Sequence, residues 1–285
     1  MNRLPFFYLF ILLLTAGSCN YKKNILKTND GYDLNKPEIF NMPDVLNEIS
    51  GITFNKGNPD TVYAEQDEEG KLFHFKLGDK KTVMSKFGKH GDYEDVSICD
   101  GFVIMLRSDG VLFTFPLTET NEEKPDNVKE WDEMLPPGEY EGLSSNDATG
   151  QVYVLCKHCS DDKTSKKMNG YIFSLGKDGG IKASGNFEIN VEDIEAKSGS
   201  NKINLHPSAL ALNPFTREWY IISSVNKLLI VAKADWKIKE VYALRPDLFL
   251  QPEGIAFDNK GTLYISNEQN TAAYGTILKF VYREN

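Results

Sequence analysis

Cysteine is scarce in this chain of 285 residues, which contains only four of them. So few cysteines exclude the disulfide-rich scaffolds that small secreted domains use. Cys156 and Cys159 have CxxC spacing, but no second CxxC pair is present to complete a zinc site. Three interpretations of the pair stay open: a structural or incidental role, a local disulfide, and a redox or metal-binding element.

Positive charge is also deficient, because 32 Lys and Arg residues face 41 Asp and Glu residues, which gives a net charge of −9. An acidic protein is a poor partner for nucleic acid, so we expect no nucleic-acid binding, and cationic ligands or metal ions suit it better. The sequence also lacks a Gly-x-Ser-x-Gly elbow, a P-loop and an HExxH motif. Nucleophilic hydrolases and nucleotide-using enzymes therefore have no support.

No apolar run reaches the length of about 20 residues that a membrane span requires. The run over residues 4–14 follows Arg3 and precedes Ala16-Gly17-Ser18-Cys19. A basic start, a short apolar stretch and small residues before a cleavage point are typical of a secretory signal peptide. The cysteine directly after the small residues predicts a lipoprotein signal over residues 1–18, with lipid on the Cys19 thiol. The alternative is an ordinary signal peptide and an incidental cysteine.

Polar residues 19–37 predict a tether between that lipid and a folded domain over residues 38–285. Cleavage removes only Arg3 among the charges, so the net charge changes from −9 to −10. We expect a monomer, anchored through Cys19 to a membrane of a Gram-negative cell envelope. No acidic run of the kind associated with surface export follows Cys19, so we expect the protein to face the periplasm.

One phrase recurs five times along the domain, and each copy is followed by a turn and two short β-rich runs. The copies are EISGITF from Glu48, YEDVSI from Tyr93, YEGLS from Tyr140, HPSALAL from His206 and QPEGIAF from Gln251. If Ser50, Glu94, Glu141, Ser208 and Glu253 are equivalent, the spacings are 44, 47, 67 and 45 residues. Units of this length with three or four antiparallel strands are the blades of a β-propeller.

We therefore predict an all-β fold, a propeller of five blades. The long third interval also allows six, because Val191-Glu192-Asp193-Ile194-Glu195-Ala196 could be another inner strand or a short helix. Residues 38–45 precede the first repeat and could supply the outer strand of the last blade, which would close the ring and remove its sheet edges. The alternatives are a β-sandwich or two smaller β domains, and five in-phase repeats argue against both.

In this order, the five phrases resemble the SdiA-regulated family of bacterial envelope propellers, over roughly residues 38–281. One phrase alone, such as Pro252-Glu253-Gly254-Ile255, is shared with NHL-repeat and gluconolactonase-like propellers, so the resemblance depends on all five. It implies a five-bladed propeller at the membrane, with a calcium site built by the blade phrases. It brings no established catalytic activity.

Two positions of the phrase, two residues apart, face the same side of each inner strand. One set is Ser50, Glu94, Glu141, Ser208 and Glu253, and the other is Glu48, Asp92, Glu139, His206 and Gln251. Ring symmetry brings each set around the channel axis, where carboxylates repel one another and a divalent cation resolves the repulsion. Ca²⁺ prefers such oxygen ligands. The alternatives are carboxylates at a solvated mouth, or protonated carboxyls bonded to backbone amides.

We accordingly predict calcium ligands and further channel residues. The predicted ligands are Glu48, Glu94, Glu141 and Glu253, and the further channel residues are Ser50, Asp92, Glu139, His206 and Ser208. Glu65, Gln66, Asn267 and Glu268 end second strands and are candidates for the channel mouth.

The function that this pattern favours is a binding or scaffold module with a structural calcium ion and an unidentified ligand or protein partner. The alternative is a calcium-dependent hydrolase of lactones or phosphoesters, in which the ion polarises an oxygen and activates water. Such an enzyme needs a base near the metal, and His206 and Glu139 are the candidates.

Overall fold

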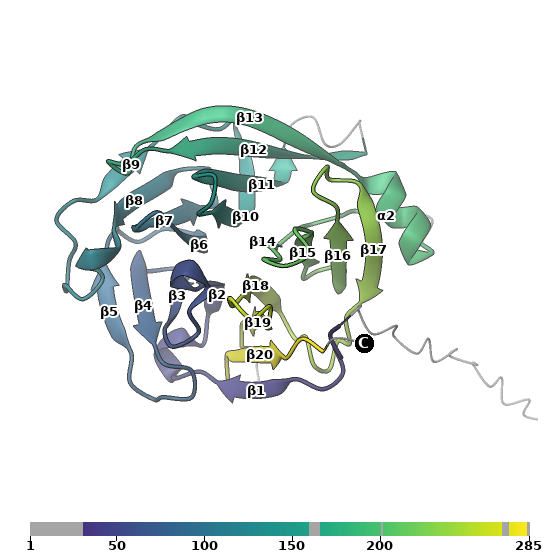
Figure 1. Cartoon of the computed structure of the whole chain (residues 1–285), viewed down its shortest axis with the longest axis horizontal. Helices are drawn as coiled ribbons and strands as arrows, with labels where there is room; N and C mark the ends of the chain where they lie inside the picture. The colour runs from purple at the N-terminus through teal and green to yellow at the C-terminus, as the bar shows by residue number, and fades with distance from the viewer. Residues whose placement is uncertain (1–30, 160–165, 201, 270–273, 284–285) are drawn as a thin grey trace, which may run out of the picture.

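Five antiparallel sheets of four strands make up the part of the chain that the structure describes. The computed structural model describes residues 31–159, 166–200, 202–269 and 274–283. Figure 1 shows the sheets as blades around a central axis, with the first strand of each repeat innermost. The predicted all-β propeller of five blades is confirmed. Residues 1–18 and Cys19 lie outside the described residues.

Each blade is a meander in which sequence neighbours pair. Blade one is β2 (Ile49–Thr53), β3 (Val62–Gln66), β4 (Lys71–Phe75) and β5 (Val83–Lys86). Blade two is β6 (Tyr93–Cys99), β7 (Phe102–Arg107), β8 (Leu112–Pro116) and β9 (Lys129–Trp131). Blade three is β10 (Gly138–Asn146), β11 (Gln151–Cys159), β12 (Lys167–Leu175) and β13 (Ile181–Asn190). Blade four is β14 (Ala209–Leu212), β15 (Trp219–Ser223), β16 (Leu228–Ala232) and β17 (Ile238–Ala243).

The fifth blade closes the ring with strands from both ends of the domain. It consists of β18 (Pro252–Phe257), β19 (Leu263–Asn267), β20 (Thr276–Phe280) and β1 (Glu38–Asn41). β1 pairs antiparallel with β20, and Glu38 lies opposite Lys279, with their Oε2 and Nζ atoms 3.0 Å apart. The residues before the first repeat therefore supply the outer strand of the last blade (Figure 1).

The segment from Val191 forms a helix, α2 (Val191–Ser198), between blades three and four. The side chain of Asn190 accepts a hydrogen bond from the Glu192 amide, and Gly199 ends the helix at a φ of 74°. This segment is therefore the short helix of the two alternatives, and the described residues contain no sixth blade. Three short 3-10 turns complete the elements: η1 (Asp44–Leu46), η2 (Asn55–Gly57) and η3 (Leu117–Glu119).

The hydrophobic core is divided into five clusters, one in each interface between neighbouring blades. In the interface between blades three and four, Trp236 stacks on both Phe187 and Trp219. Between blades four and five, Tyr32 and Leu34 are buried, so packed residues begin within the segment expected as a tether. No helix among the described residues is long and apolar enough to cross a membrane.

Candidate functional site

A β-bulge interrupts four of the five inner strands at the same position of the repeat. The pairing with the second strand skips Glu94 in β6, Glu141 in β10 and Glu253 in β18, and β2 is irregular between Ile49 and Ile52. A bulge leaves its extra residue outside the ladder and redirects that side chain. In three inner strands, therefore, a β-bulge at the same repeat position directs a glutamate side chain out of the sheet.

The three bulged glutamates, which we call the axial glutamates, interact electrostatically across the ring. Burial raises the pKa of Glu94 to about 9, and the charges of Glu141 and Asp92 add to the effect. Burial likewise raises the pKa of Glu253 to about 8, with Glu141 and Glu268 contributing. The axial glutamates thus share an environment that opposes three simultaneous negative charges.

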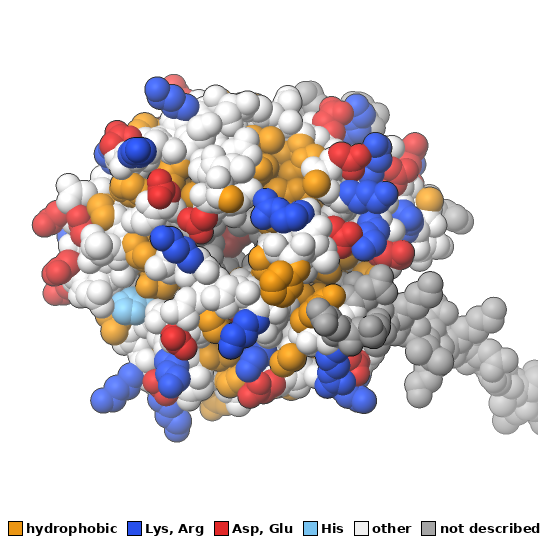
Figure 2. Space-filling model, in the orientation of Figure 1, with side chains coloured by type: hydrophobic (Ala, Val, Ile, Leu, Met, Phe, Trp, Pro, Cys, Tyr) orange, Lys and Arg blue, Asp and Glu red, His pale blue; other side chains and the backbone are white. Residues whose placement is uncertain are grey.

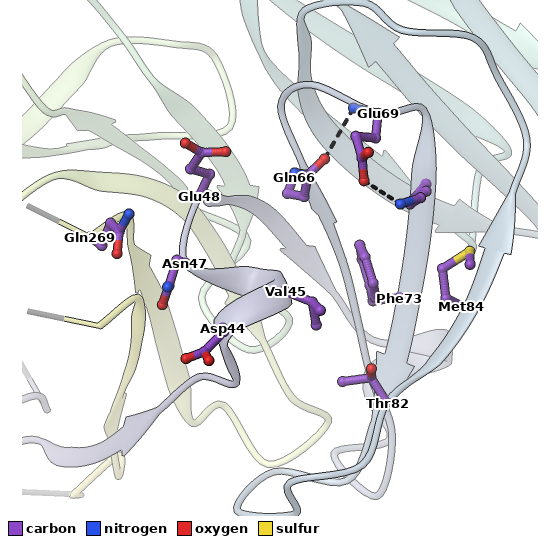
Figure 3. A pocket seen from close by; sticks show the side chains of 11 residues that line it. Asp44, Val45, Asn47, Glu48, Gln66, Glu69, Phe73, Thr82, Met84 and Gln269 are labelled. Carbon is purple, nitrogen blue, oxygen red and sulfur yellow. Dashed lines mark hydrogen bonds and ion pairs between the residues drawn. The ribbon is translucent and has the colours of Figure 1, made fainter.

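A second set of acids, which we call the mouth acids, lies beside the axial glutamates. It consists of Glu48, Asp67, Asp92 and Glu268. Burial, then the charges of Glu48, Glu68 and Asp92, raise the pKa of Asp67 to about 6. Burial, then Asp67 and Glu48, raise that of Glu268 to about 7. Glu48 also lines a cavity of about 410 Å³ at the boundary of blades five and one, with Gln66 and Glu69 on its other side (Figure 3).

One lysine lies among these acids. Lys157 of β11 has its Nζ 2.9 Å from Glu139 Oε1 and also bonds Glu141 Oε1. Burial opposes the charge of Lys157, but the hydrogen bonds to Glu141 and Glu139 outweigh it and raise the lysine pKa. The ammonium of Lys157 thus pairs directly with one of the three axial glutamates. A second lysine, Lys227, interacts electrostatically with Glu253 and donates a hydrogen bond to the Leu250 carbonyl at 2.7 Å.

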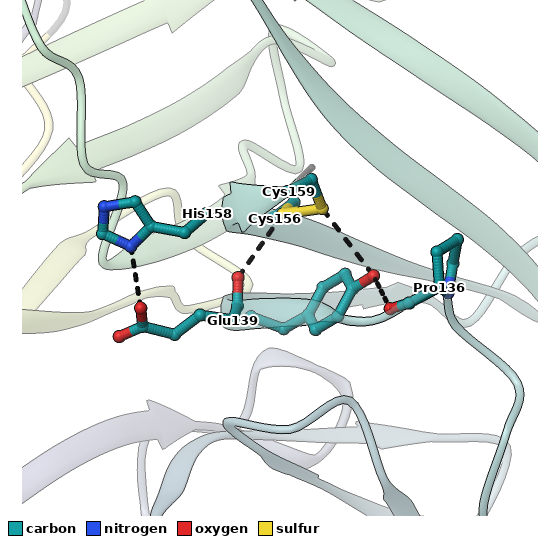
Figure 4. The surroundings of a disulfide bond; sticks show 6 residues. Pro136, Glu139, Cys156, His158 and Cys159 are labelled. Carbon is teal, nitrogen blue, oxygen red and sulfur yellow. Dashed lines mark hydrogen bonds and ion pairs between the residues drawn. A yellow bond between two sulfur atoms is a disulfide. The ribbon is translucent and has the colours of Figure 1, made fainter. Parts of the chain in front are cut away.

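Next to Lys157, the structure contains a Cys156–Cys159 disulfide, which is one of the three interpretations left open by the sequence. His158 lies between the two cysteines in sequence, and its Nδ1 is 2.7 Å from Glu139 Oε2. Figure 4 shows the ring turned toward this carboxylate. The His158 ring also packs edge-on against His206, at 4.5 Å between centroids. Burial, then the neighbouring His158 and Lys157, lower the pKa of His206. Sequence reasoning missed Lys157 and His158 because both lie on a second strand, outside the repeated phrase.

Ser50 and Ser208, predicted as further channel residues, bond to the neighbouring inner strand. Ser50 Oγ donates to the Glu94 carbonyl at 2.9 Å, and Ser208 Oγ donates to the Pro252 carbonyl at 2.9 Å. Each hydroxyl therefore joins one blade to the next. Among the other predicted positions, the Gln251 side-chain amide bonds the Glu268 carboxylate.

Two fully buried acids adjoin the channel. Glu65 is one of the predicted candidates for the channel mouth, whereas sequence reasoning assigned no such role to Asp95. Glu65 Oε1 accepts from the Gly51 amide at 2.7 Å, while its Oε2 has no hydrogen-bond partner within the described part of the chain. Asp95 accepts from the Val96 and Leu143 amides at 2.8 and 2.7 Å, so it bridges blades two and three. Asp95 directly follows Glu94 in the YEDVSI phrase, and this position could have indicated that Asp95 also lies near the channel.

The donor chemistry of the channel fits a hard cation, because the axial glutamates and mouth acids offer only oxygen. Besides Glu65 Oε2, the buried Asp67 Oδ1 and Asn267 Oδ1 have no hydrogen-bond partner among the described residues. In that part of the chain, no group of three or more His, Cys, Asp or Glu is arranged so that it could hold a metal ion. One of the axial glutamates, Glu141, is paired with the ammonium of Lys157.

Two further cavities lie along the ring. Residues from all five inner strands line a narrow space of about 130 Å³, including Thr53, Ser97 and Ser144. Figure 2 shows the hollow at the centre of the ring. Lys157, His158 and Cys159 also line a cavity of about 1160 Å³ that extends to Val191 and Glu195 of α2.

Comparison with solved structures finds the same fold at low sequence identity. Glutaminyl cyclase from Myxococcus xanthus has a TM-score of 0.57 at 12% identity, covering 86% of this chain and 95% of the cyclase. A luciferin-regenerating enzyme has a TM-score of 0.53 at 10% identity, covering 86% and 95%. Regucalcin from Agrobacterium tumefaciens, a calcium-binding protein, has a TM-score of 0.50 at 12% identity, covering 89% and 95%. At these identities the likeness establishes the propeller fold alone.

Sequence comparison gives a more specific result. The family model described as SdiA-regulated matches residues 24–272, which is most of the chain and all five inner strands. A search among curated proteins finds no match.

Proposed function

The chain belongs to the SdiA-regulated family, and from that premise we propose that it is a calcium-binding module of the bacterial cell envelope. The propeller presents a binding surface to a ligand or protein partner, and the ion lies in the axial channel. Glu94, Glu141 and Glu253 would hold it, with Glu48 assisting from the mouth. When bound, calcium neutralises the charge of the channel and cross-links inner strands of different blades.

The observation that carries this proposal is the shared bulge position of the axial glutamates. Three carboxyls are turned toward one axis although burial penalises their charge, as the raised pKa values of Glu94 and Glu253 record. A divalent cation compensates several such charges at once, and an all-oxygen set suits Ca²⁺ better than Zn²⁺.

Calorimetric titration of the full-length protein with CaCl₂ tests the proposal. Binding should raise the stability of the fold by about 2.7 kcal/mol when free calcium exceeds Kd a hundredfold. A chelator should therefore lower the melting temperature of the native protein and lower that of Glu141→Gln much less. Equal chelator sensitivity in the two proteins would contradict calcium binding at this position.

The proposed location is a periplasm-facing membrane, with the lipid on Cys19 as the anchor and the propeller as a monomer. Cys19→Ser should move the protein out of the membrane fraction or leave an unprocessed precursor. If Cys19→Ser fractionates like the native protein, the lipoprotein proposal fails while the calcium proposal stands.

A second candidate, a calcium-dependent hydrolase of lactones or phosphoesters, has one specific observation in its favour. Glu139 bonds His158 Nδ1, which orients the ring so that Nε2 is the atom available for proton transfer. His158 also lines the cavity of about 1160 Å³, where a substrate would have room. The bonds of Glu139 to Lys157 and His158 outweigh burial and lower the pKa of this carboxyl, which makes Glu139 a weak base.

A panel of lactones and phosphoesters, assayed with calcium and with chelator, separates the two functions. For an enzyme, His158→Gln should lower turnover by about 10² to 10⁴. The matched control is His90→Gln, which changes an exposed histidine of the loop between blades one and two. No turnover of any substrate by the native protein would favour the binding module.

A further inference from the structure

Blade three has two adjacent bulges, one on each of its first two strands. The β10–β11 pairing joins Glu139 to His158 and then Tyr140 to Cys156, which skips Lys157. It next joins Gly142 to Leu155, which skips Glu141. The two residues excluded from the ladder are the two members of the ion pair in the channel. The local backbone of blade three is therefore built to bring this lysine and this glutamate together.

The disulfide spans the bulge that carries Lys157. The Cα atoms of Cys156 and Cys159 are 6.1 Å apart, whereas three residues of regular strand cover about 10 Å. Both cysteines are buried, with Cys156 Sγ 3.4 Å from the Glu139 carbonyl oxygen and Cys159 Sγ 3.7 Å from the Tyr140 hydroxyl (Figure 4). The bond thus keeps the strand end shortened, and Lys157 stays projected out of the ladder.

We propose that Lys157 is the specificity-determining residue of the channel, a built-in cation that an incoming ion must displace, and that the Cys156–Cys159 disulfide is its positioning element. This inference rests on the proposed calcium function. It follows from the contacts of Glu141: the carboxylate that would bind an ion already binds the ammonium of Lys157. A cation can bind Glu141 Oε1 only when that pair separates.

Displacement discriminates between cations by charge. A monovalent ion replaces one positive charge with another, so the channel gains nothing from the exchange. A divalent ion supplies one more charge than the ammonium it displaces, and that excess favours ionisation of the other two axial glutamates, Glu94 and Glu253. The side chain of Lys157 also borders the cavity of about 1160 Å³ beside the channel, and this cavity can accommodate the ammonium after displacement. Lys157 therefore favours Ca²⁺ over Na⁺ and K⁺.

The test compares the full-length native protein with Lys157→Met, which keeps an unbranched side chain of nearly the same length and removes its charge. Calcium affinity is measured by calorimetry in sodium chloride and in N-methylglucamine chloride at equal ionic strength, because that bulky organic cation is a poor competitor for a narrow channel. Lys157→Met should bind calcium about tenfold more tightly or better in N-methylglucamine, since Glu141 is free. Sodium should weaken calcium binding in Lys157→Met and leave the native affinity nearly unchanged. Lys157→Gln provides a second variant if Lys157→Met does not fold.

Lys279→Met is the matched control, because it removes the same charge from β20, the third strand of blade five, where Lys279 pairs with Glu38 of the outer strand. This control should bind calcium like the native protein. If no protein of the series binds calcium, the proposed function fails. If the native protein and both Lys157 variants bind calcium equally tightly and with equal sodium sensitivity, or if the variants bind more weakly, only the role of Lys157 is overturned.

The disulfide is tested by Cys156→Ala with Cys159→Ala. Freeing the strand end should tighten calcium binding in the same direction as Lys157→Met, although the variant is less stable. Adding Lys157→Met to the double variant should then produce no further change, because both act through one ammonium. A lower melting temperature with unchanged calcium affinity would overturn the positioning role of the disulfide.

Discussion

Removing the charge of Glu94 should change how the stability of the metal-free protein depends on pH. Glu94 is partly buried on its bulge, and burial together with Glu141 and Asp92 raises its folded pKa to about 9. In the unfolded chain a glutamate has a pKa of about 4.3. Between these values the folded protein holds a proton that the unfolded chain has lost. The stabilisation is complete below the unfolded pKa and is lost as the pH rises through the folded pKa.

The magnitude follows from the two pKa values. One group with such a difference changes the free energy of unfolding by about 1.4 kcal/mol per pH unit inside the window. Two units, from pH 5.5 to 7.5, give an upper value of about 2.7 kcal/mol. Solvent reaches part of the Glu94 side chain and screens its charge, so we expect about 1 kcal/mol. The glutamine of Glu94→Gln does not titrate. Between pH 5.5 and 7.5 the free energy of unfolding of this variant should therefore fall by about 1 kcal/mol less than that of the native protein.

Urea unfolding in the presence of chelator, at pH 5.5 and 7.5, measures this difference. Glu122→Gln is the matched control, because it makes the same chemical change on an exposed loop of blade two. Calcium should then stabilise the native protein and the control at pH 7.5, and stabilise Glu94→Gln much less. Parallel stability changes for all three proteins between the two pH values would refute the argument that Glu94 is held near other acids at a buried axis.

Three further predictions concern the channel and the inner strands. Calcium binding at pH 7 should release protons, because the raised pKa values of Glu94 and Glu253 leave both carboxyls protonated before the ion arrives; binding heats that do not vary between buffers of different ionisation enthalpy would contradict this. Ser208→Ala should lower the free energy of unfolding by about 1 kcal/mol, because it removes the bond that joins blade four to blade five; a urea midpoint unchanged from the native protein would contradict it. Asp95→Asn should destabilise by about 1 to 3 kcal/mol, because an amide has one acceptor oxygen and the carboxylate uses both of its own; an unchanged urea midpoint would show that the bridge between blades two and three contributes nothing.

The blade architecture could be predicted from sequence because it depends on periodic signals. Five in-phase copies of one phrase specify five inner strands. The Asp-Gly sequence at residues 100 and 101, which is typical of tight hairpins, forms a two-residue hairpin with φ values of 46° and 81°. The strand that closes the ring was also predictable, because residues 38–45 precede the first repeat and the last repeat lacks a fourth strand of its own.

The channel was less predictable because alternation along a strand assumes an unbroken ladder. The repeat marks Glu94, Glu141 and Glu253 as equivalent, but nothing in the phrase signals that each is the extra residue of a bulge. Lys157 has no equivalent in the repeated phrase, because it lies on the second strand of blade three. Among the described residues, the bulge on that strand and the disulfide that spans it occur in blade three only. Its place beside Glu141 depends on a pairing register, and register is a property of two strands that one strand's sequence does not contain.

The pairing of β1 with β20 also imposes an order on folding. Glu38 and Lys279 pair across 241 residues. The first strand of the propeller to leave a ribosome or a secretion channel therefore stays unpaired until the last strand has emerged. Until β20 has emerged, β1 has no strand to pair with, and the fifth blade of the partial ring is incomplete. Blades one to four can form as they emerge, since each is a local meander, while closure comes only with the C-terminal strand. A chain that ends within β20 would therefore not close the ring. The edges of β1 and β19, which β20 normally covers, would then be exposed to neighbouring molecules.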